Sequence, residues 1–154
     1  MTLIGCPIAE PDAEIARHIA DDTPTARKRE ILCSVLGLGP NAAPLILTFL
    51  PEIGALDRKQ AGSIAHLVPH SREAGHWKGK SLISGGRKAL RDALFMPAPV
   101  AMRFNPCITA KSTQLRDAGK PAKIAIVAIM RKLLETANAL VEADRLWSIK
   151  SPCA

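Results

Sequence analysis

Residues 119–147 read "GKPAKIAIVAIMRKLLETANALVEADRLW", the longest stretch of helical apolar periodicity in the chain. The apolar residues with this spacing are Ile126, Met130, Leu133, Ala137, Leu140 and Val141, and Ile124, Val127, Ile129 and Leu134 extend them beyond one face. A helix that is apolar on several sides is covered by neighbours on those sides. The stretch therefore predicts a long helix at the centre of a bundle, and the polar residues 107–118 before it carry no predicted element.

The segments further upstream also carry helical signals. Residues 56–69 predict a short helix with Asp57 as its N-cap and Pro69 at its end. Residues 87–104 form another helical run, which Pro97 and Pro99 must kink or divide. Strand patterning is scarce and tyrosine is absent, so the predicted fold class is mostly α, with the helices packed in a single bundle.

Residues 26–54 predict two helices joined by a tight hairpin at Gly37-Leu38-Gly39-Pro40. The glycines permit backbone conformations with positive φ, and Pro40 suits the first turn of the second helix. In a helix-hairpin-helix element of this form, backbone amides and the following helix N-terminus can face a DNA phosphate. A plain α-hairpin turn would use the same glycines, so both interpretations stay open.

The charge of the chain is concentrated in one segment. The net charge is +7 over 154 residues, a length that suits one domain. Residues 72–132 contain thirteen Lys and Arg against three acids, a balance of +10, so the remaining residues sum to −3. This asymmetry favours a polyanion partner, most simply nucleic acid, over a basic face that serves only solubility.

Several function classes have no support in the sequence. No apolar run reaches the roughly 18 to 20 residues of a membrane span, and the N-terminus lacks signal-peptide features, so a cytoplasmic location is expected. The four cysteines have no C-x-x-C spacing and are expected to be buried thiols. The histidines lack the companions of a metal site, and "SGGRK" does not match a P-loop.

A basic, glycine-rich loop is predicted between the helices of residues 56–69 and 87–104. Its glycines would let backbone amides approach a phosphate, with basic side chains around them. The candidate nucleic-acid-binding residues, with the hairpin glycines, are Gly37, Gly39, Lys78, Gly79, Lys80, Gly85, Gly86, Arg87, Lys88 and Arg91. A solvated loop that only joins two helices is the alternative.

Five motifs, in order, resemble the C-terminal half of insertion-sequence transposases of the one-ten type, also called DEDD or bridge-RNA recombinases. They are "SVLGLGP", "LPEIGALDRKQAGSIAHLVP", "REAGHWKGKSLISGGRKALRDALFMPA", "VAMRFNP" and "GKPAKIAIVAIMRKLLETANAL". The similarity runs from about Ile31 to Leu146, and "GGRKALRDALFMPA" with "MRKLLETANAL" is its most specific part. The resemblance implies residues 1–29 as a remnant of a connecting helical arm, 30–147 as the transposase-type helical domain and 148–154 as a tail.

The resemblance also implies partners and chemistry. Family enzymes bind DNA and a structured guide RNA, and their N-terminal RuvC-like domain carries four acids that hold divalent metal. Nothing here resembles that domain, so we expect a truncated copy without a metal or other cofactor of its own. Partners would be DNA, guide RNA, and further copies of the chain or a full-length transposase.

The family's nucleophilic serine aligns with Ala74, and a methyl group cannot attack phosphorus. Ser71, Ser81 and Ser84 are nearby, but a displaced nucleophile loses orders of magnitude in rate. The sequence thus favours a DNA-binding fragment, derived from transposition, without a catalytic residue of its own. The alternatives are a working recombinase subunit that uses another serine or a separate acidic partner, and a basic helical interaction module without catalysis.

Overall fold

The computed structural model describes residues 14, 22–70, 73–74, 77–78, 83 and 85–148, and this part of the chain is mostly helical, as predicted. Its elements are α2 (Thr23–Ser34), α3 (Ala42–Phe49), α4 (Arg58–Ile64), β1 (Glu73–Ala74), β2 (Trp77–Lys78), α5 (Lys88–Phe95), α6 (Pro97–Phe104), α7 (Pro106–Asp117) and α8 (Ala122–Glu142). None of the described helices is long and apolar enough to cross a membrane.

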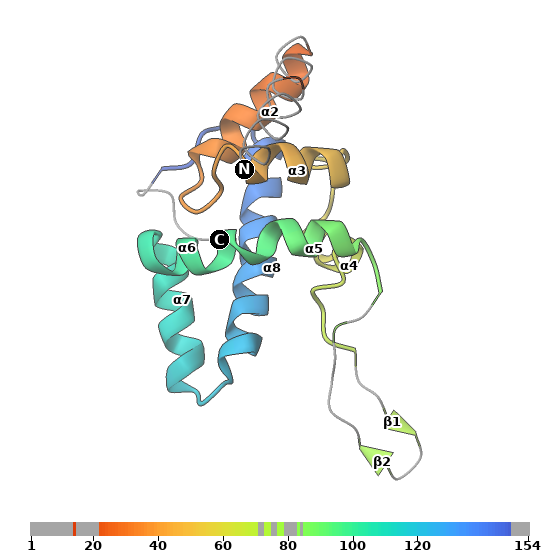
Figure 1. Cartoon of the computed structure of the whole chain (residues 1–154), viewed down its shortest axis with the longest axis vertical. Coiled ribbons are helices and arrows are strands. Elements are labelled where there is room, and N and C mark those ends of the chain that lie inside the picture. The colour runs from red at the N-terminus through yellow and green to blue at the C-terminus, as the bar shows by residue number, and fades with distance from the viewer. Residues whose placement is uncertain are drawn as a thin grey trace, which may run out of the picture.

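Helix α8 is the centre of the bundle, which confirms the prediction from residues 119–147. It contacts α2, α4, α5, α6 and α7. Figure 1 shows α8 along the long axis of the molecule, with α5 and α6 crossing it, α7 beside it, and α2 and α3 towards one end. Its side chains Ile129, Leu133 and Leu134 are fully buried, because neighbours cover several of its faces.

Prolines divide the predicted helix of residues 87–104, and an asparagine follows its end. Helix α5 ends at Phe95 and α6 begins at Pro97, as the paired prolines predicted. Asn105 ends α6 and is the N-cap of α7, where its side-chain oxygen accepts a hydrogen bond from the Ile108 amide at 3.5 Å. Asn105 is 2% exposed, so this junction lies inside the bundle.

Helix α7 corrects the sequence analysis, which left residues 107–118 as a polar segment. The segment has few apolar residues, and only Ile108 and Ser112 of α7 are buried. Its helical form therefore depends on packing against α6 and α8, a tertiary effect that outweighs weak local preference. Asn105 is both the C-cap of α6 and the N-cap of α7, and Pro106 is the first residue of α7, a position that suits proline.

Two cysteines also correct the sequence analysis. Cys33 is a free thiol on the exposed side of α2, and Cys107 is disulfide-bonded. Neither is the buried thiol that the spacing predicted. Cys6 and Cys153 lie outside the described residues.

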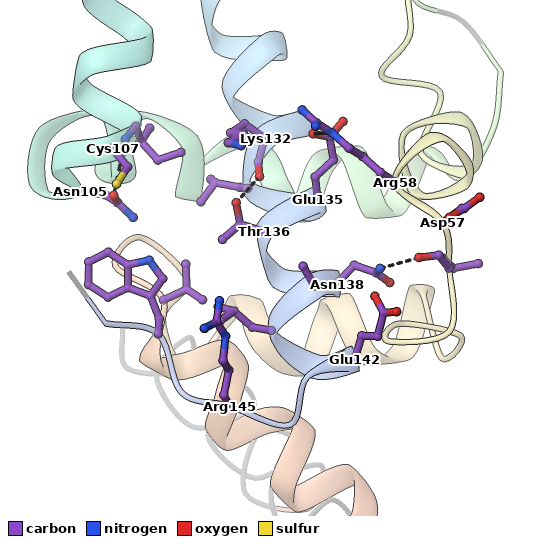
Figure 2. Close-up of a pocket in the computed structure, with 17 residues that line it drawn as sticks. Asp57, Arg58, Asn105, Cys107, Lys132, Glu135, Thr136, Asn138, Glu142 and Arg145 are labelled. Atoms are coloured by element: carbon purple, nitrogen blue, oxygen red, sulfur yellow. Dashed lines mark hydrogen bonds and ion pairs between the residues drawn. The ribbon is translucent and has the colours of Figure 1, made fainter. Parts of the chain in front are cut away.

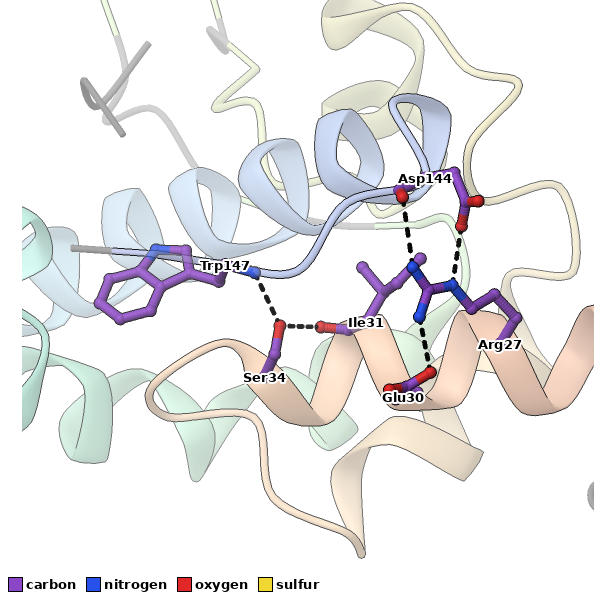
Figure 3. A network of polar contacts seen from close by, with 6 residues as sticks. All are labelled: Arg27, Glu30, Ile31, Ser34, Asp144 and Trp147. Carbon is purple, nitrogen blue, oxygen red and sulfur yellow. Dashed lines mark hydrogen bonds and ion pairs between the residues drawn. The ribbon is translucent and has the colours of Figure 1, made fainter. Parts of the chain in front are cut away.

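Polar contacts attach α2 to the residues that follow α8 (Figure 3). The Arg27 guanidinium donates from Nε to Asp144 at 2.9 Å and from an Nη to Glu30 at 2.7 Å. The Ser34 hydroxyl accepts a hydrogen bond from the Trp147 amide at 2.9 Å. The boundary predicted at residue 30 thus lies inside a helix whose two halves both contact the C-terminal segment.

Candidate nucleic-acid interface

The two hairpin glycines have different surroundings. Gly37 has φ +112°, and a Cβ added there would lie 2.6 Å from the Ala101 Cβ, so the absent side chain lets the hairpin pack against α6. A Cβ on Gly39 would meet nothing within 4 Å among the described atoms. The Gly39 carbonyl accepts hydrogen bonds from the amides of Ala42 and Ala43 at 3.1 Å and so starts α3. Gly39 is the one of the two that lies towards open space.

Gly85 and Gly86 pack against a histidine. Their φ values are +82° and +62°, a region that favours glycine. A Cβ on Gly86 would lie 2.2 Å from Nδ1 of His66, and one on Gly85 would lie 3.3 Å from the same ring. The His66 ring in turn contacts the His70 ring, with 5.5 Å between centroids. These glycines therefore let the chain return closely over His66 before α5 begins.

Arg87 connects the start of α5 to the end of α3. Its two Nη groups donate to the two carboxylate oxygens of Glu52 at 2.8 and 2.7 Å, and one also donates to the Phe49 carbonyl at 2.9 Å. The hydrogen bonds from Arg87 are the main reason that the pKa of Glu52 is lowered from 4.5 to about 2, and a backbone hydrogen bond is the second reason. Arg87 is thus held by internal partners.

Lys88 and Arg91 also have internal partners. Lys88 forms an ion pair with Asp92 at 2.6 Å, four residues along the exposed face of α5. Arg91 donates to the carbonyls of Ala65, at 3.3 Å, and Gly85. The Lys88 side chain is largely exposed, and an exposed pair of this kind is weak enough to exchange its partner for a phosphate.

The two strands occupy the predicted basic loop. Glu73 pairs with Lys78 and Ala74 with Trp77 in an antiparallel ribbon, and Ala74 is the last residue of β1. Figure 1 places β1 and β2 away from the helices, beyond α4. Of the other residues predicted in this loop, Ser71, Gly79, Lys80, Ser81 and Ser84 lie outside the described residues.

Sequence analysis missed a cluster in which a buried acid holds two arginines. Glu135 on α8 is 8% exposed. It accepts from Nε of Arg58 at 2.8 Å and from Nε of Arg131 at 2.7 Å. The signal was present, because Glu135 interrupts the apolar stripe of α8 and Arg131 precedes it by one turn, the spacing of a helical ion pair.

A buried asparagine one turn away fixes the chain that leads into α4. Asn138 accepts from the Gly54 amide at 2.9 Å and donates to the Leu56 carbonyl at 2.6 Å. Asp57 is the N-cap of α4, as predicted, and its amide donates to the Gln60 side chain at 2.9 Å. Arg58, the first residue of α4, is therefore placed by contacts on both sides.

A cavity of about 280 Å³ lies beside this cluster, between α8, the start of α7 and the C-terminal segment (Figure 2). Arg58, Lys132 and Arg145 contribute its basic groups, and Asp57, Glu135 and Glu142 contribute its acids. Burial, and then the nearby charge of Arg58, lower the pKa of the Lys132 ammonium. No group of three or more metal-ligating side chains occurs among the described residues.

Comparison with known proteins shows similarity to transposases and to gene-inverting proteins. The family model described as "Transposase IS116/IS110/IS902 family" matches residues 29–113, more than half of the chain. A pilin gene-inverting protein of Moraxella bovis is 33% identical over 144 residues, 90% of this chain and 44% of that protein. A pilin gene-inverting protein of Moraxella lacunata is 33% identical over 124 residues, 77% of this chain and 38% of that protein. The chain thus spans less than half the length of these relatives, and it belongs to the IS116/IS110/IS902 transposase family.

Proposed function

We propose that this chain is a DNA-binding part of a recombination system and lacks a nucleophile of its own. The observation that carries the proposal is the concentration of charge, +10 between residues 72 and 132, in a member of a transposase family. Positive charge of this density binds phosphates by releasing their counterions, which gives affinity for any nucleic acid backbone.

The relatives support DNA as the partner. Both are named for inverting a pilin gene, and gene inversion is a recombination of DNA. The family resemblance adds structured guide RNA, further copies of the chain and a full-length transposase as proposed partners, in the cytoplasm. Divalent metal would then be held by acidic residues outside the C-terminal transposase region. This chain would hold no cofactor.

Two regions of the predicted binding residues are the proposed contacts with DNA. One is the basic ribbon, which is β1 and β2 with Gly79 and Lys80 after them in the sequence, and the other is the hairpin at residues 37–40. Lys78 lies at the end of β2, close to Gly79 and Lys80 in the sequence, and the ribbon is separate from the packed helices. Lys88, the first residue of α5, contributes an exposed ammonium. The open side of Gly39, at the start of α3, is the proposed backbone contact for a phosphate.

Ala74 carries the proposal that the chain lacks a nucleophile. It is the last residue of β1 and stands at the position that the family resemblance assigns to the nucleophile, and alanine offers no oxygen or sulfur to attack phosphorus. The proposal predicts that Ala74→Ser will bind DNA as the wild type does. Any covalent protein–DNA adduct should appear only in that variant, and an adduct formed by the wild type would show a nucleophile elsewhere, such as Ser71, Ser81 or Ser84.

A basic helical interaction module without catalysis is the second candidate. The internal partners of Arg87 and Arg91 favour it, because part of the basic set already stabilises the fold. The two candidates differ in direct binding of the purified chain to a fluorescent DNA duplex of about 30 base pairs in about 50 mM salt. Submicromolar binding supports the DNA-binding function, and the absence of binding at this salt supports the interaction module.

A further inference from the structure

The contacts of Arg58 and Arg131 leave their outer nitrogens available. Both side chains donate to Glu135 through Nε, and within the described part of the chain neither guanidinium has another hydrogen-bond partner. The Arg58 side chain is 68% exposed and that of Arg131 is 36% exposed, whereas Glu135 is buried. A guanidinium held by Nε keeps two Nη groups, with four N–H donors, for an acceptor on the solvent side.

The elements that carry these arginines are held in place. A Cβ on Gly62 of α4 would lie 3.2 Å from Nε of Arg131, so this buried glycine lets the arginine stem pass closely over α4. Asn138 ties the residues before α4 to α8, and Figure 2 shows Arg58 reaching from α4 to Glu135. The two guanidinium groups are therefore positioned before any ligand binds, which reduces the ordering cost of binding.

Three cations lie around Glu135. They are Arg58, Arg131 and Lys132, and Lys111 of α7 lies near enough to act on Lys132. Asp57, Glu142 and Arg145 line the adjoining cavity. Burial, then the charge of Arg58 and, more weakly, that of Lys111 lower the pKa of Lys132, while Glu135 opposes them. An anion at this place would relieve the repulsion among the cations.

We propose that Arg58 and Arg131, held by Glu135, form a phosphate clamp for a nucleic acid backbone, with Lys132 beside them. The proposal rests on the nucleic-acid-binding function proposed above and adds a second contact region, separate from the basic ribbon. Paired guanidinium groups match the geometry of phosphate oxygens better than ammonium groups do. Glu135 is a positioning residue here, because it acts through the arginines and does not contact the ligand.

Glu135→Gln is the decisive variant because charge and geometry predict opposite results. The change removes one negative charge, so a general electrostatic effect would strengthen nucleic acid binding. The clamp predicts about tenfold weaker binding, since a neutral amide holds the two guanidinium groups less firmly. Arg58→Lys and Arg131→Lys keep the net charge but remove Nε and the planar fork, and each should also weaken binding about fivefold to tenfold.

The assay measures the Kd of each full-length variant for a DNA duplex and for an RNA hairpin of about 30 nucleotides, at one salt concentration. Arg103→Lys on α6 is the matched control, because Arg103 lies over the Phe104 ring and has no acid partner among the described residues. Urea denaturation shows whether each variant is folded, and the Nε–H signals of Arg58 and Arg131 in NMR spectra report the clamp directly. These two signals should shift when nucleic acid is added to the wild type.

The outcomes separate this proposal from the proposed function. If the wild type binds DNA or RNA while Glu135→Gln and both lysine variants keep its Kd, the clamp is overturned and the DNA-binding function stands. If the wild type binds neither probe, both proposals fail. A loss in the three variants but not in Arg103→Lys supports the clamp, and the probe with the larger loss identifies the nucleic acid it holds.

Discussion

Replacing Asn138 with alanine is expected to lower the free energy of unfolding by about 2–4 kcal/mol. The side chain is 3% exposed and makes two hydrogen bonds, from the Gly54 amide at 2.9 Å and to the Leu56 carbonyl at 2.6 Å. Leaving either backbone group unpaired costs about 1–3 kcal/mol, and the partial exposure of both groups places each loss in the lower half of that range. The variant should remain folded, because domains of this size have about 5–15 kcal/mol of stability.

Urea denaturation of the wild type and Asn138→Ala measures this loss, provided that the m values agree. Gln114→Ala is the control, because Gln114 only accepts a hydrogen bond from Lys111 on the exposed face of α7, and its loss should stay within about 0.5 kcal/mol. Hydrogen exchange at the Gly54 amide is a second readout and should become faster in Asn138→Ala. A loss below about 0.5 kcal/mol, with unchanged protection of Gly54, would refute the argument that Asn138 fixes the entry to α4.

Three other substitutions or conditions test separate parts of the fold. Gly86→Ala should destabilise the protein by about 1–3 kcal/mol in thermal or urea unfolding, because of its positive φ and the contact with His66, and adding His66→Ala should restore only the part due to the contact. The Glu52 carboxyl should titrate near pH 2 in an NMR experiment, so its ion pair with Arg87 stabilises fully above pH 4.5 and is lost as the pH falls towards 2; a midpoint at 4.5 would contradict this. Gly62→Ala should keep the free energy of unfolding within about 1 kcal/mol of the wild type, because the better helix preference of alanine offsets its contact with the flexible Arg131 side chain. The same variant should bind nucleic acid more weakly, because the added methyl group displaces the Arg131 guanidinium.

The central part of the fold could be predicted from sequence because its signals are local. The apolar faces of α8 and the prolines at 97 and 99 fix elements whose position follows from periodicity and backbone geometry. Helix α7 could not be predicted in this way, because its polar residues 107–118 give a weak pattern and its stability depends on α6 and α8. The signal that was available, Asn105 followed by Pro106, fits both a helix end and a helix start.

The candidate site was also predicted from the sequence only in part. Charge concentration and the family motifs could be read from the sequence, and they indicated a nucleic-acid-binding region. The internal partners of Arg87 depend on where Glu52 lies after folding, 35 residues away in the sequence. The pairing of Arg58 with Glu135 spans 77 residues and joins two of the quoted motifs, so only the packed helices reveal it.

The most direct test of the account is the salt dependence of DNA binding by the intact chain. The Kd for a DNA duplex should be measured from about 50 to 200 mM salt. Affinity should fall steeply, with a log–log slope that corresponds to on the order of five or more released phosphate counterions. A flat salt dependence, or no binding at the lowest salt, would contradict the claim that the basic segment of this transposase-family chain holds a nucleic acid backbone.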